Sequence, residues 1–371
     1  MEKIPMSAPD LDESDIQAVL EVLRSGRLAL GPKMREFEEL MAEYIGVKYA
    51  VAVSSGTAGL HILVRALGIK EQDEVLVPSF TFSASVNAIL YERAVPVFVD
   101  IEPDTYNLDP DDLERKVTKR TKAIMAVDIF GHPAEWDEIL RIAEKYNLKV
   151  IDDSCEALGA EYKGKKIGQF GDSACFAFYP NKQMTTGEGG IIVTNNEEIA
   201  KLARSLRNQG RGEMSAWLHH ERLGYNYRMD EMSSALGVSQ LRRIEKFLEK
   251  REKVAQMYTE KLRNFPWVRP PVVKPYVRMS WFVYVITLER GLDRDEVIKK
   301  MEERGIPARG YFSPIHLQRY IREMFGTKEG MLPVTEDISK RTLALPFHNN
   351  LSEEEIEEVV RVLKESVETC L

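Results

Sequence analysis

The sequence predicts an α/β protein in which helices wrap a mostly parallel central sheet, followed by a smaller C-terminal α+β domain. Three observations support this fold class. Short apolar runs alternate with helical patterns from about residue 48 to residue 195. Most of these runs are continuously apolar, as expected for strands that are covered on both faces. Near the C-terminus, the strand-like stretch WFVYVITL (281–288) stands among helical patterns, which indicates a second, smaller lobe.

Apolar runs define the predicted strands of the central sheet. In chain order they are YAVAV (49–53), EVLVP (74–78), VPVFV (95–99), AIMAV (123–127), LKVID (148–152), ACFAF (174–178) and GIIVT (190–194). Helical patterns such as TAGLHILVRALG and PAEWDEILRIAEKYN lie between several of them. Alternation of strands and helices implies parallel pairing, because a parallel crossover needs a helix-length connection. In such sheets ligands bind at the carboxyl ends of the strands.

The chain is predicted to divide into a large domain at 1–250 and a small domain at 251–371. Helical patterns at roughly 11–24 and 33–45 are assigned to the large domain. The charged, amphipathic segment 230–262 has the pattern of helices that lead out of the sheet domain. The proline-punctuated stretch NFPWVRPPVVKP follows it and is typical of a connector.

Charge and cysteine content exclude several classes of function. The formal net charge of −8 gives no attraction to nucleic acid or an anionic membrane, so neither is a predicted partner. No run is apolar enough to span a bilayer, and the N-terminal stretch lacks the pattern of a secretory signal. Cys155, Cys175 and Cys370 form no CxxC pair, which argues against a disulfide framework or a metal site. We therefore expect a cytoplasmic protein without a metal.

A candidate phosphate site directly follows the first predicted strand. SSGTAGLHILVRAL (54–67) begins with a Ser-Gly-Thr turn and continues as a helix. Such a turn leaves backbone N–H groups and hydroxyls at the positive end of the helix dipole, where a phosphate binds well. Simple capping of the helix by Ser or Thr gives the same pattern.

Two later strand ends carry charged residues. KVIDDSCEALGA (149–160) ends a buried strand with Asp152 and Asp153. A carboxylate fixed there can hold the proton on a buried cationic nitrogen, although an aspartate at such a place is often only a helix cap. Lys182 lies between the predicted strands ACFAF and GIIVT, where partial burial favours the neutral, nucleophilic amine.

Together these features match the requirements of pyridoxal 5′-phosphate (PLP). The cofactor needs a site for its phosphate, an acid partner for its pyridinium nitrogen and a lysine that forms a Schiff base with it. Each feature is common by itself, but all of them occur, in this order, at strand ends of one α/β domain. The sequence therefore predicts a PLP-binding protein.

The sequence also resembles the DegT/DnrJ/EryC1/StrS family of PLP-dependent sugar aminotransferases, nearly from end to end. Ordered blocks carry this resemblance, among them SGRLALGPKMREFEELMAEYIGVKYAVAVSSGTAGLHI, VPSFTFSASVNAI, IDDSCEALGAEYKGKKIGQFGD, YPNKQMTTGEGGIIVTN, LGYNYRMDEMSSALGVSQL and GIPARGYFSPIHLQ. The resemblance implies the fold-type I architecture of PLP transferases and a transaminase activity.

The resemblance also implies roles for single residues. Lys182 would form the Schiff base and move the proton during amino transfer. Asp153, in preference to Asp152, would pair with the pyridinium nitrogen. Gly56 and Thr57 would bind the phosphate.

Three more residues match cofactor-binding positions of the family. Phe82 would stack on the cofactor ring, and Glu156 would lie near the ring hydroxyl, where relatives usually carry glutamine or histidine. Asn226, in LGYNYRM, would reach the phosphate from the neighbouring subunit. This last role makes a homodimer with shared active sites the smallest competent unit.

For the substrates, the resemblance implies transfer of an amino group from glutamate or glutamine to a nucleotide-linked keto sugar in amino-sugar or polysaccharide biosynthesis. Glu156 and Asp128 together favour a 4-keto-6-deoxy sugar. Candidates for the substrate site are Arg228, Arg309, Tyr311 and His316. A loop histidine is also commonly structural, and Arg228 fits an interdomain ion pair equally well.

Two positions depart from the family pattern. Ala177 stands where many relatives carry a serine that contacts the phosphate, and one lost hydrogen bond to a charged group costs about 1.5–3 kcal/mol. Asp128 stands where histidine is frequent, which changes the charge near the site. Two alternatives stay open: a cyclitol or other non-sugar ketone as the amino acceptor, and a PLP-binding regulatory relative that does not catalyse.

Overall fold

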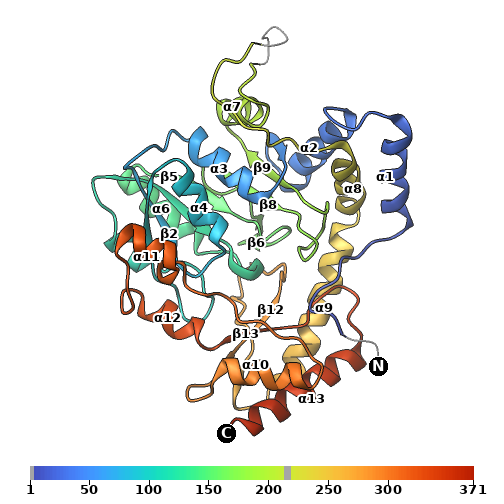
Figure 1. Cartoon of the computed structure of the whole chain (residues 1–371), viewed down its shortest axis with the longest axis vertical. Helices are drawn as coiled ribbons and strands as arrows, with labels where there is room; N and C mark the ends of the chain where they lie inside the picture. The colour runs from blue at the N-terminus through green and yellow to red at the C-terminus, as the bar shows by residue number, and fades with distance from the viewer. Residues whose placement is uncertain (1–3, 213–218) are drawn as a thin grey trace.

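A seven-stranded sheet, with strand order β1-β9-β8-β5-β4-β2-β3, forms the centre of the molecule. The computed structural model describes residues 4–212 and 219–371 (Figure 1). The strands of this sheet are β1 (Tyr49–Val53), β2 (Glu74–Pro78), β3 (Val95–Val99), β4 (Thr121–Val127), β5 (Lys149–Asp153), β8 (Ser173–Ala177) and β9 (Gly190–Thr194). Within this sheet β9 runs antiparallel to both neighbours, whereas β8, β5, β4, β2 and β3 pair in parallel. The predicted α/β class with a mostly parallel sheet is confirmed.

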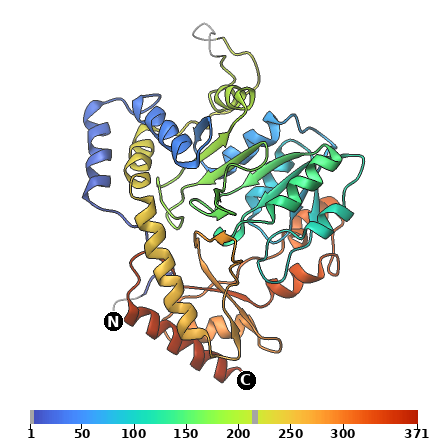
Figure 2. The same ribbon diagram turned by 180° about the vertical axis from the view of Figure 1, so that it is seen from behind.

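Helices cover both faces of this sheet (Figures 1 and 2). On one face α3, α4 and α7 bury side chains such as Leu60, Val86 and Ala203 against the strands. On the other face α2, α6 and α8 do the same with Phe37, Ile139 and other apolar side chains. The bounds of the helices are α1 (Glu13–Ser25), α2 (Pro32–Ile45), α3 (Gly56–Ala66), α4 (Ser83–Tyr91), α5 (Pro110–Arg115), α6 (Trp136–Tyr146), α7 (Glu197–Arg207) and α8 (Glu231–Leu241).

The smaller lobe is built on a three-stranded sheet with the order β10-β12-β13. Its core contains Tyr284 and Leu343 from the sheet together with Val297 and Leu363 from the helices. The elements of this lobe are β10 (Val268–Arg269), β12 (Tyr284–Leu288), α10 (Arg294–Glu303), β13 (Thr342–Leu345) and α13 (Glu353–Thr369). A third sheet, of order β11-β6-β7, joins β6 (Glu161–Tyr162) and β7 (Lys165–Lys166) to β11 (Val277–Arg278).

One long helix, α9 (Ile244–Leu262), runs from the large lobe into the small one (Figure 2). Phe247 packs in a core of the large lobe, whereas Tyr258 packs in the core of the small lobe. The division into 1–250 and 251–371, which falls inside α9, remains our proposal. One segment of 251–371 returns to the large lobe, where Ile315 and Ile321 pack in its core.

This returning segment contains short elements that lie over the carboxyl edge of the central sheet. They are η2 (Ile315–Leu317), α11 (Arg319–Phe325) and α12 (Pro333–Ser339), and η1 (Ile129–Gly131) follows β4 on the sheet side. Among the helices that the structure describes, none is both long and apolar enough to cross a membrane.

Candidate active site

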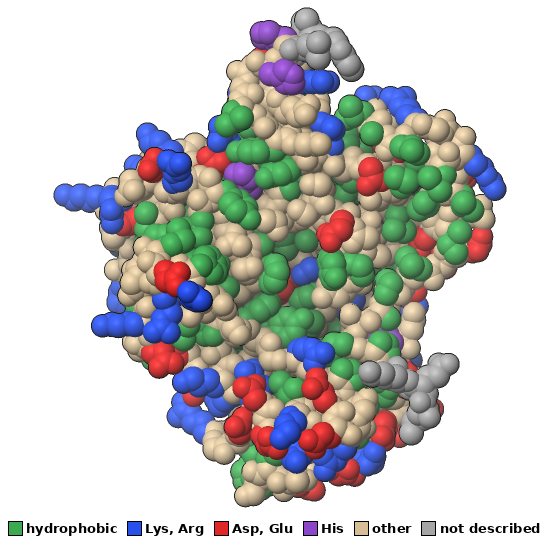
Figure 3. Space-filling model, in the orientation of Figure 1, with side chains coloured by type: hydrophobic (Ala, Val, Ile, Leu, Met, Phe, Trp, Pro, Cys, Tyr) green, Lys and Arg blue, Asp and Glu red, His purple; other side chains and the backbone are tan. Residues whose placement is uncertain are grey.

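A cavity of about 820 Å³ lies where the carboxyl ends of β5 and β8 approach the beginnings of α3 and α4. The space-filling view is hollowed near its centre, between the two lobes (Figure 3). The lining residues used below are Gly56, Thr57, Phe82, Ser85, Asp153, Cys155, Glu156, Ala177, Lys182, Phe282, Arg309, Tyr311 and Gln318. Most of the residues predicted to bind a cofactor therefore line one cavity.

The turn at Gly56 closes one end of the cavity. Ser55 caps α3, since its Oγ accepts a hydrogen bond of 3.1 Å from the backbone N–H of Ala58. The first N–H groups of a helix have no partner within it and so can bind an anion. A Cβ atom at position 56 would lie 2.7 Å from Cβ of Ala177 and 2.9 Å from Sγ of Cys155. Only glycine fits so closely above these two side chains.

Asp153 is the last residue of β5, and its carboxylate is held by two donors. Ser85 Oγ donates to Oδ2 over 2.7 Å, and the N–H of Cys155 donates to Oδ1 over 3.2 Å. The hydroxyl of Thr81 in turn lies 2.9 Å from Ser85 Oγ and can donate to it. Although the side chain is buried, it borders the cavity. Hydrogen bonds that donate to a carboxylate favour its charged form.

Lys182 enters the cavity from the loop between β8 and β9. Its side chain is 13% exposed, with Nζ 3.6 Å from Oε1 of Glu156. The amine also lies 3.7 Å from the centre of the Phe282 ring. Burial raises the pKa of Glu156, while the charge of Lys182 and the N–H of Phe130, which donates to Oε2, oppose this rise. The amine therefore faces the cavity between a carboxylate and an aromatic ring.

Phe82 is the most exposed large hydrophobic residue of the cavity wall. It immediately precedes α4, and 61% of it is exposed. A phenylalanine that packs in the core would be buried, so this exposure indicates another role. An exposed ring on a cavity wall is available to stack on a planar ligand.

Asp152 and Asp128 lie behind the cavity and do not line it. Both are fully buried, and burial raises the pKa of each, that of Asp128 to about 6. Asp128 Oδ1 accepts hydrogen bonds from the N–H of Ala134 and from Trp136 Nε1. Its Oδ2 has no donor in the described part of the chain unless Asp152 is protonated. We infer that Asp128 and Asp152 share one proton.

We expect the substitution Asp128→Asn to change how stability depends on pH. A carboxyl whose pKa is raised on folding stabilises the protein at low pH, and this contribution is lost as the pH rises through about 6. The difference in free energy of unfolding, variant minus wild type, should therefore increase by about 1–3 kcal/mol when the pH is raised from 4.5 to 7.5. Urea denaturation at both pH values measures this. Exposed Asp111→Asn is the control, and an equal pH response in both variants would contradict the shared proton.

The predicted substrate residues Arg309 and Tyr311 lie on the small-lobe side of the cavity. Arg309 pairs with Glu302 at the surface. Burial raises the pKa of Tyr311 to about 12, so its hydroxyl is protonated at neutral pH and can donate a hydrogen bond. Both residues line the same cavity as Lys182.

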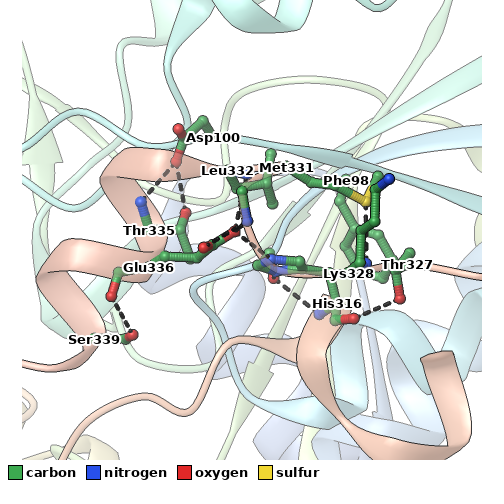
Figure 4. Close-up of polar contacts among 12 residues, drawn as sticks. Phe98, Asp100, His316, Thr327, Lys328, Met331, Leu332, Thr335, Glu336 and Ser339 are labelled. Carbon is green, nitrogen blue, oxygen red and sulfur yellow. Dashed lines mark hydrogen bonds and ion pairs between the residues drawn. The ribbon is translucent and has the colours of Figure 1, made fainter.

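His316 does not reach the cavity, contrary to its prediction as a substrate residue. It is fully buried, with Nδ1 2.7 Å from Ser79 Oγ and Nε2 3.1 Å from Glu336 Oε1. Figure 4 shows His316 between Glu336 and Thr327, and it shows Asp100 on the far side of Glu336, where its carboxylate accepts hydrogen bonds from Thr335. These contacts fix the returning segment to the ends of β2 and β3. His316 therefore has the structural role that a loop histidine commonly has.

The substitution His316→Ala should destabilise the protein without altering substrate affinity directly. It removes two buried hydrogen bonds and leaves a void, which together cost about 2–4 kcal/mol. Chemical denaturation measures the loss, and the Michaelis constant for the amino donor should stay within about twofold. Gln318→Ala, which changes a cavity residue two positions away, is the matched control. An unchanged stability with a raised Michaelis constant would restore His316 to the substrate site.

Asn226 and Arg228 also lie outside the cavity of this chain. Asn226 is exposed, and its backbone bridges to Asn208. Arg228 donates a 3.1 Å hydrogen bond to Asn208 Oδ1, and its described contacts do not include the interdomain ion pair considered for it. A role for Asn226 at the phosphate requires a second copy of the chain, as its prediction states.

Several cavity residues have no signal in the sequence. Ser85 and Phe282 touch Asp153 and Lys182 but come from distant parts of the chain. Ser85 falls within the block SFTFSAS, where a serine before a helix is usually a cap. Phe282 belongs to an apolar stretch that is predicted only as a strand. Their roles depend on tertiary contacts that no local pattern encodes.

The donor set of the cavity fits PLP. A helix N-terminus at Gly56 suits the phosphate, the carboxylate of Asp153 suits a protonated ring nitrogen, and the amine of Lys182 suits an aldehyde. Phe82 offers an exposed ring for stacking. Within the described ranges, no group of three or more His, Cys, Asp or Glu side chains is placed to hold a metal ion.

Comparisons with known proteins agree with this arrangement. The sequence pattern of the DegT/DnrJ/EryC1/StrS aminotransferase family matches residues 9–364. GDP-perosamine synthase of Caulobacter vibrioides is 40% identical over 368 residues, which cover 97% of this chain and 97% of that protein. EpsN of Bacillus subtilis, whose name proposes it as a pyridoxal phosphate-dependent aminotransferase, is 39% identical over 370 residues, covering 97% and 95%.

A solved structure is similar over the whole chain. It is PseC of Helicobacter pylori, described as an aminotransferase involved in the biosynthesis of pseudoaminic acid. The TM-score is 0.95 at 31% sequence identity, and the match covers 99% of this chain and 100% of that one. The arrangement of both lobes is therefore the one found in that enzyme.

Proposed function

The chain belongs to the DegT/DnrJ/EryC1/StrS aminotransferase family and is a transaminase, and from this premise we propose its cofactor and substrates. The cofactor is PLP, the amino donor is glutamate or glutamine, and the acceptor is a nucleotide-linked keto sugar of the 4-keto-6-deoxy class. The names of GDP-perosamine synthase and of PseC support a sugar acceptor. The name of EpsN supports the cofactor.

One observation carries the proposal: the amine of Lys182, the carboxylate of Asp153 and the N-terminus of α3 line one cavity. When bound there, PLP supplies an aldehyde that takes up an amino group and a ring that withdraws electrons from the reacting carbon. The size of the cavity, about 820 Å³, leaves room for a substrate beside a cofactor.

Each residue of the site then has a separate task. Lys182 would hold the cofactor through its Nζ, and once the incoming amine has displaced it the same nitrogen would carry the proton that amino transfer moves. Glu156, 3.6 Å from that nitrogen, keeps the amine inside the site and can accept a hydrogen bond near the ring hydroxyl. Asp153, held by Ser85, keeps the ring nitrogen protonated. Gly56 and Thr57 bind the phosphate, and Phe82 excludes water from one face of the ring.

We propose in addition that the active unit is a homodimer that shares its sites. Exposed leucines line the first helix and the turn after it, with Leu23 49%, Leu28 43% and Leu30 45% exposed. Figure 3 shows hydrophobic side chains gathered over this part of the surface. Apolar surface of this kind is typical of a subunit interface. Asn226 of a second copy would then complete the phosphate site.

Mixing the variants Lys182→Ala and Asn226→Ala should test the shared site. If Lys182 and Asn226 act in one site from different subunits, Lys182→Ala and Asn226→Ala dimers regain activity when unfolded and refolded together, because each mixed dimer has one intact site. Activity in the mixture, compared with either variant refolded alone, is the measurement. No recovery in a mixture that sedimentation shows to be dimeric would contradict the sharing.

The substrate proposal is tested by a screen. Purified protein loaded with PLP is given glutamate or glutamine and a set of acceptors that contains nucleotide-linked keto sugars and a cyclitol ketone, and mass spectrometry detects the amino product. We expect amination of a 4-keto-6-deoxy sugar nucleotide. Amination of a cyclitol ketone alone would favour the non-sugar alternative. Release of no 2-oxo acid from either donor, in protein that does bind PLP, would favour a regulatory relative.

A further inference from the structure

Arg251 of α9 is a fully buried arginine whose guanidinium contacts only backbone carbonyls in its described hydrogen bonds. Its Nη1 donates to the carbonyl oxygens of Trp281 and Phe282 over 2.9 and 3.2 Å. Its Nη2 donates to the carbonyl oxygen of Lys182 over 2.9 Å. The residue is 2% exposed, and burial lowers its pKa to about 10, which still leaves it charged at neutral pH.

A buried arginine without a carboxylate partner is costly. Removing a charge from water costs several kcal/mol even after the protein relaxes. In the described part of the chain, no carboxylate oxygen lies within ion-pair distance of the Arg251 guanidinium. The charge of Asp10 and the Phe347 ring, whose centre lies 5.4 Å from Cζ, stabilise the cation from farther away, and the direct hydrogen bonds go to carbonyls. An apolar side chain would fill the same space in the core more cheaply. The three carbonyls that Arg251 binds therefore indicate a role beyond packing.

Two of the three residues that supply these carbonyls, Lys182 and Phe282, also line the cavity. The ring of Phe282 lies 3.7 Å from Nζ of Lys182. Arg251 thus holds the backbone of the lysine and the backbone of the residue on which the lysine amine rests. The neighbouring Gln183 adds a parallel connection, since its Nε2 donates to the carbonyl of Glu156 over 2.6 Å and to Ser280 Oγ over 2.9 Å.

We propose that Arg251 is a positioning residue for Lys182. By joining the β8–β9 loop to the segment that contains Phe282, it fixes the lysine amine between the Phe282 ring and the Glu156 carboxylate. The inference rests on the proposed function, because only an amine that must reach a cofactor needs this placement. Misplacement of a reacting atom by about 1 Å lowers rates by about 10²-fold, so a loosened lysine backbone should be measurable.

The test compares two arginines that bind carbonyls. Arg251→Met removes the charge and all three hydrogen bonds but keeps most of the volume. Arg341→Met is the matched control, since Arg341 donates to the carbonyl of Leu288 over 3.0 Å and to Asp337, and neither partner lines the cavity. Each apoprotein is mixed with PLP, the lysine adduct is reduced with borohydride at set times, and mass spectrometry quantifies it at Lys182. Chemical denaturation of each variant gives its loss of stability.

We expect Arg251→Met to slow formation of the adduct at least about 10-fold, while Arg341→Met stays within about twofold at a similar loss of stability. The conservative variant Arg251→Lys keeps the charge and reaches fewer carbonyls, so it should fall between the wild type and Arg251→Met. Equal rates in both methionine variants would overturn the proposal. If Arg251→Met does not fold, Arg251→Lys decides: slowing by about threefold or more supports the positioning role, and a rate within twofold of wild type overturns it.

Failure of this inference differs from failure of the proposed function. A wild-type protein that forms no adduct at Lys182 would overturn both. If the wild type forms the adduct and Arg251→Met forms it as fast as Arg341→Met, Arg251 has no positioning role, whereas the proposed PLP site and transaminase function stand.

Discussion

Lys182→Ala is expected to abolish transamination, with a loss of at least about 10³-fold in the turnover of glutamate to 2-oxoglutarate. The substitution removes both the amine that binds the cofactor and the group that moves the proton. The fold should survive, because the side chain of Lys182 borders the cavity and its described contacts are with Glu156 and the Phe282 ring. A coupled assay for 2-oxoglutarate measures the rate, and thermal unfolding checks the fold.

The control for this variant is Lys165→Ala, an exposed lysine in β7. It should leave both the rate and the PLP content unchanged. A Lys182→Ala protein that still turns over glutamate at the wild-type rate would refute the proposed site as a whole, including the roles given to Asp153 and Glu156.

The second large effect concerns the two adjacent aspartates at the end of β5. Asp153→Asn should lower turnover by about 10²-fold or more, since an amide cannot hold the proton on the ring nitrogen as a carboxylate does. Asp152→Asn should stay within about threefold of the wild type, because Asp152 is inferred to carry a proton already and an amide can donate to Asp128 in its place. Steady-state kinetics of both variants under the same PLP saturation measure the difference.

This pair is its own matched control, since the same chemical change is made at neighbouring positions with similar burial. Asp153→Asn keeps the hydrogen bond from Ser85, because the amide oxygen can accept it. Similar losses in both variants would mean that the whole buried acid cluster sets the ring protonation. A larger loss in Asp152→Asn would reverse the two assignments.

The sheet was predictable because its strands are continuous apolar runs that end at turn residues. The predicted ranges of β1, β2, β3 and β9 agree with the structure, and β5 and β8 differ from it by one residue at each end. The reversal of β9 was not predictable from its pattern. A short buried strand has the same composition in either direction, and its direction depends on pairing with β1 and β8.

The cofactor side of the site was more predictable than the substrate side. Asp153 ends β5, and Gly56 and Lys182 follow β1 and β8, so the parallel direction of these three strands brings the residues to one edge of the sheet. His316 looks like a ligand in sequence, but Ser79 and Glu336, from distant segments, bury it completely. Arg251 looks like one more solvated charge on an amphipathic helix, and its contact with Lys182 depends on how α9 crosses between the lobes.

The continuity of α9 has a consequence for how the molecule denatures. A helix of 19 residues, roughly 28 Å long, contributes side chains to the interior of both lobes. Unfolding of the C-terminal lobe would unwind this shared helix as far as Arg251. The hydrogen bond from Arg251 to the carbonyl of Lys182 would then be lost, which would free the β8–β9 loop. The cavity that contains Lys182 and the fold of the smaller lobe should therefore be lost in a single cooperative transition, with no thermal intermediate that keeps one without the other.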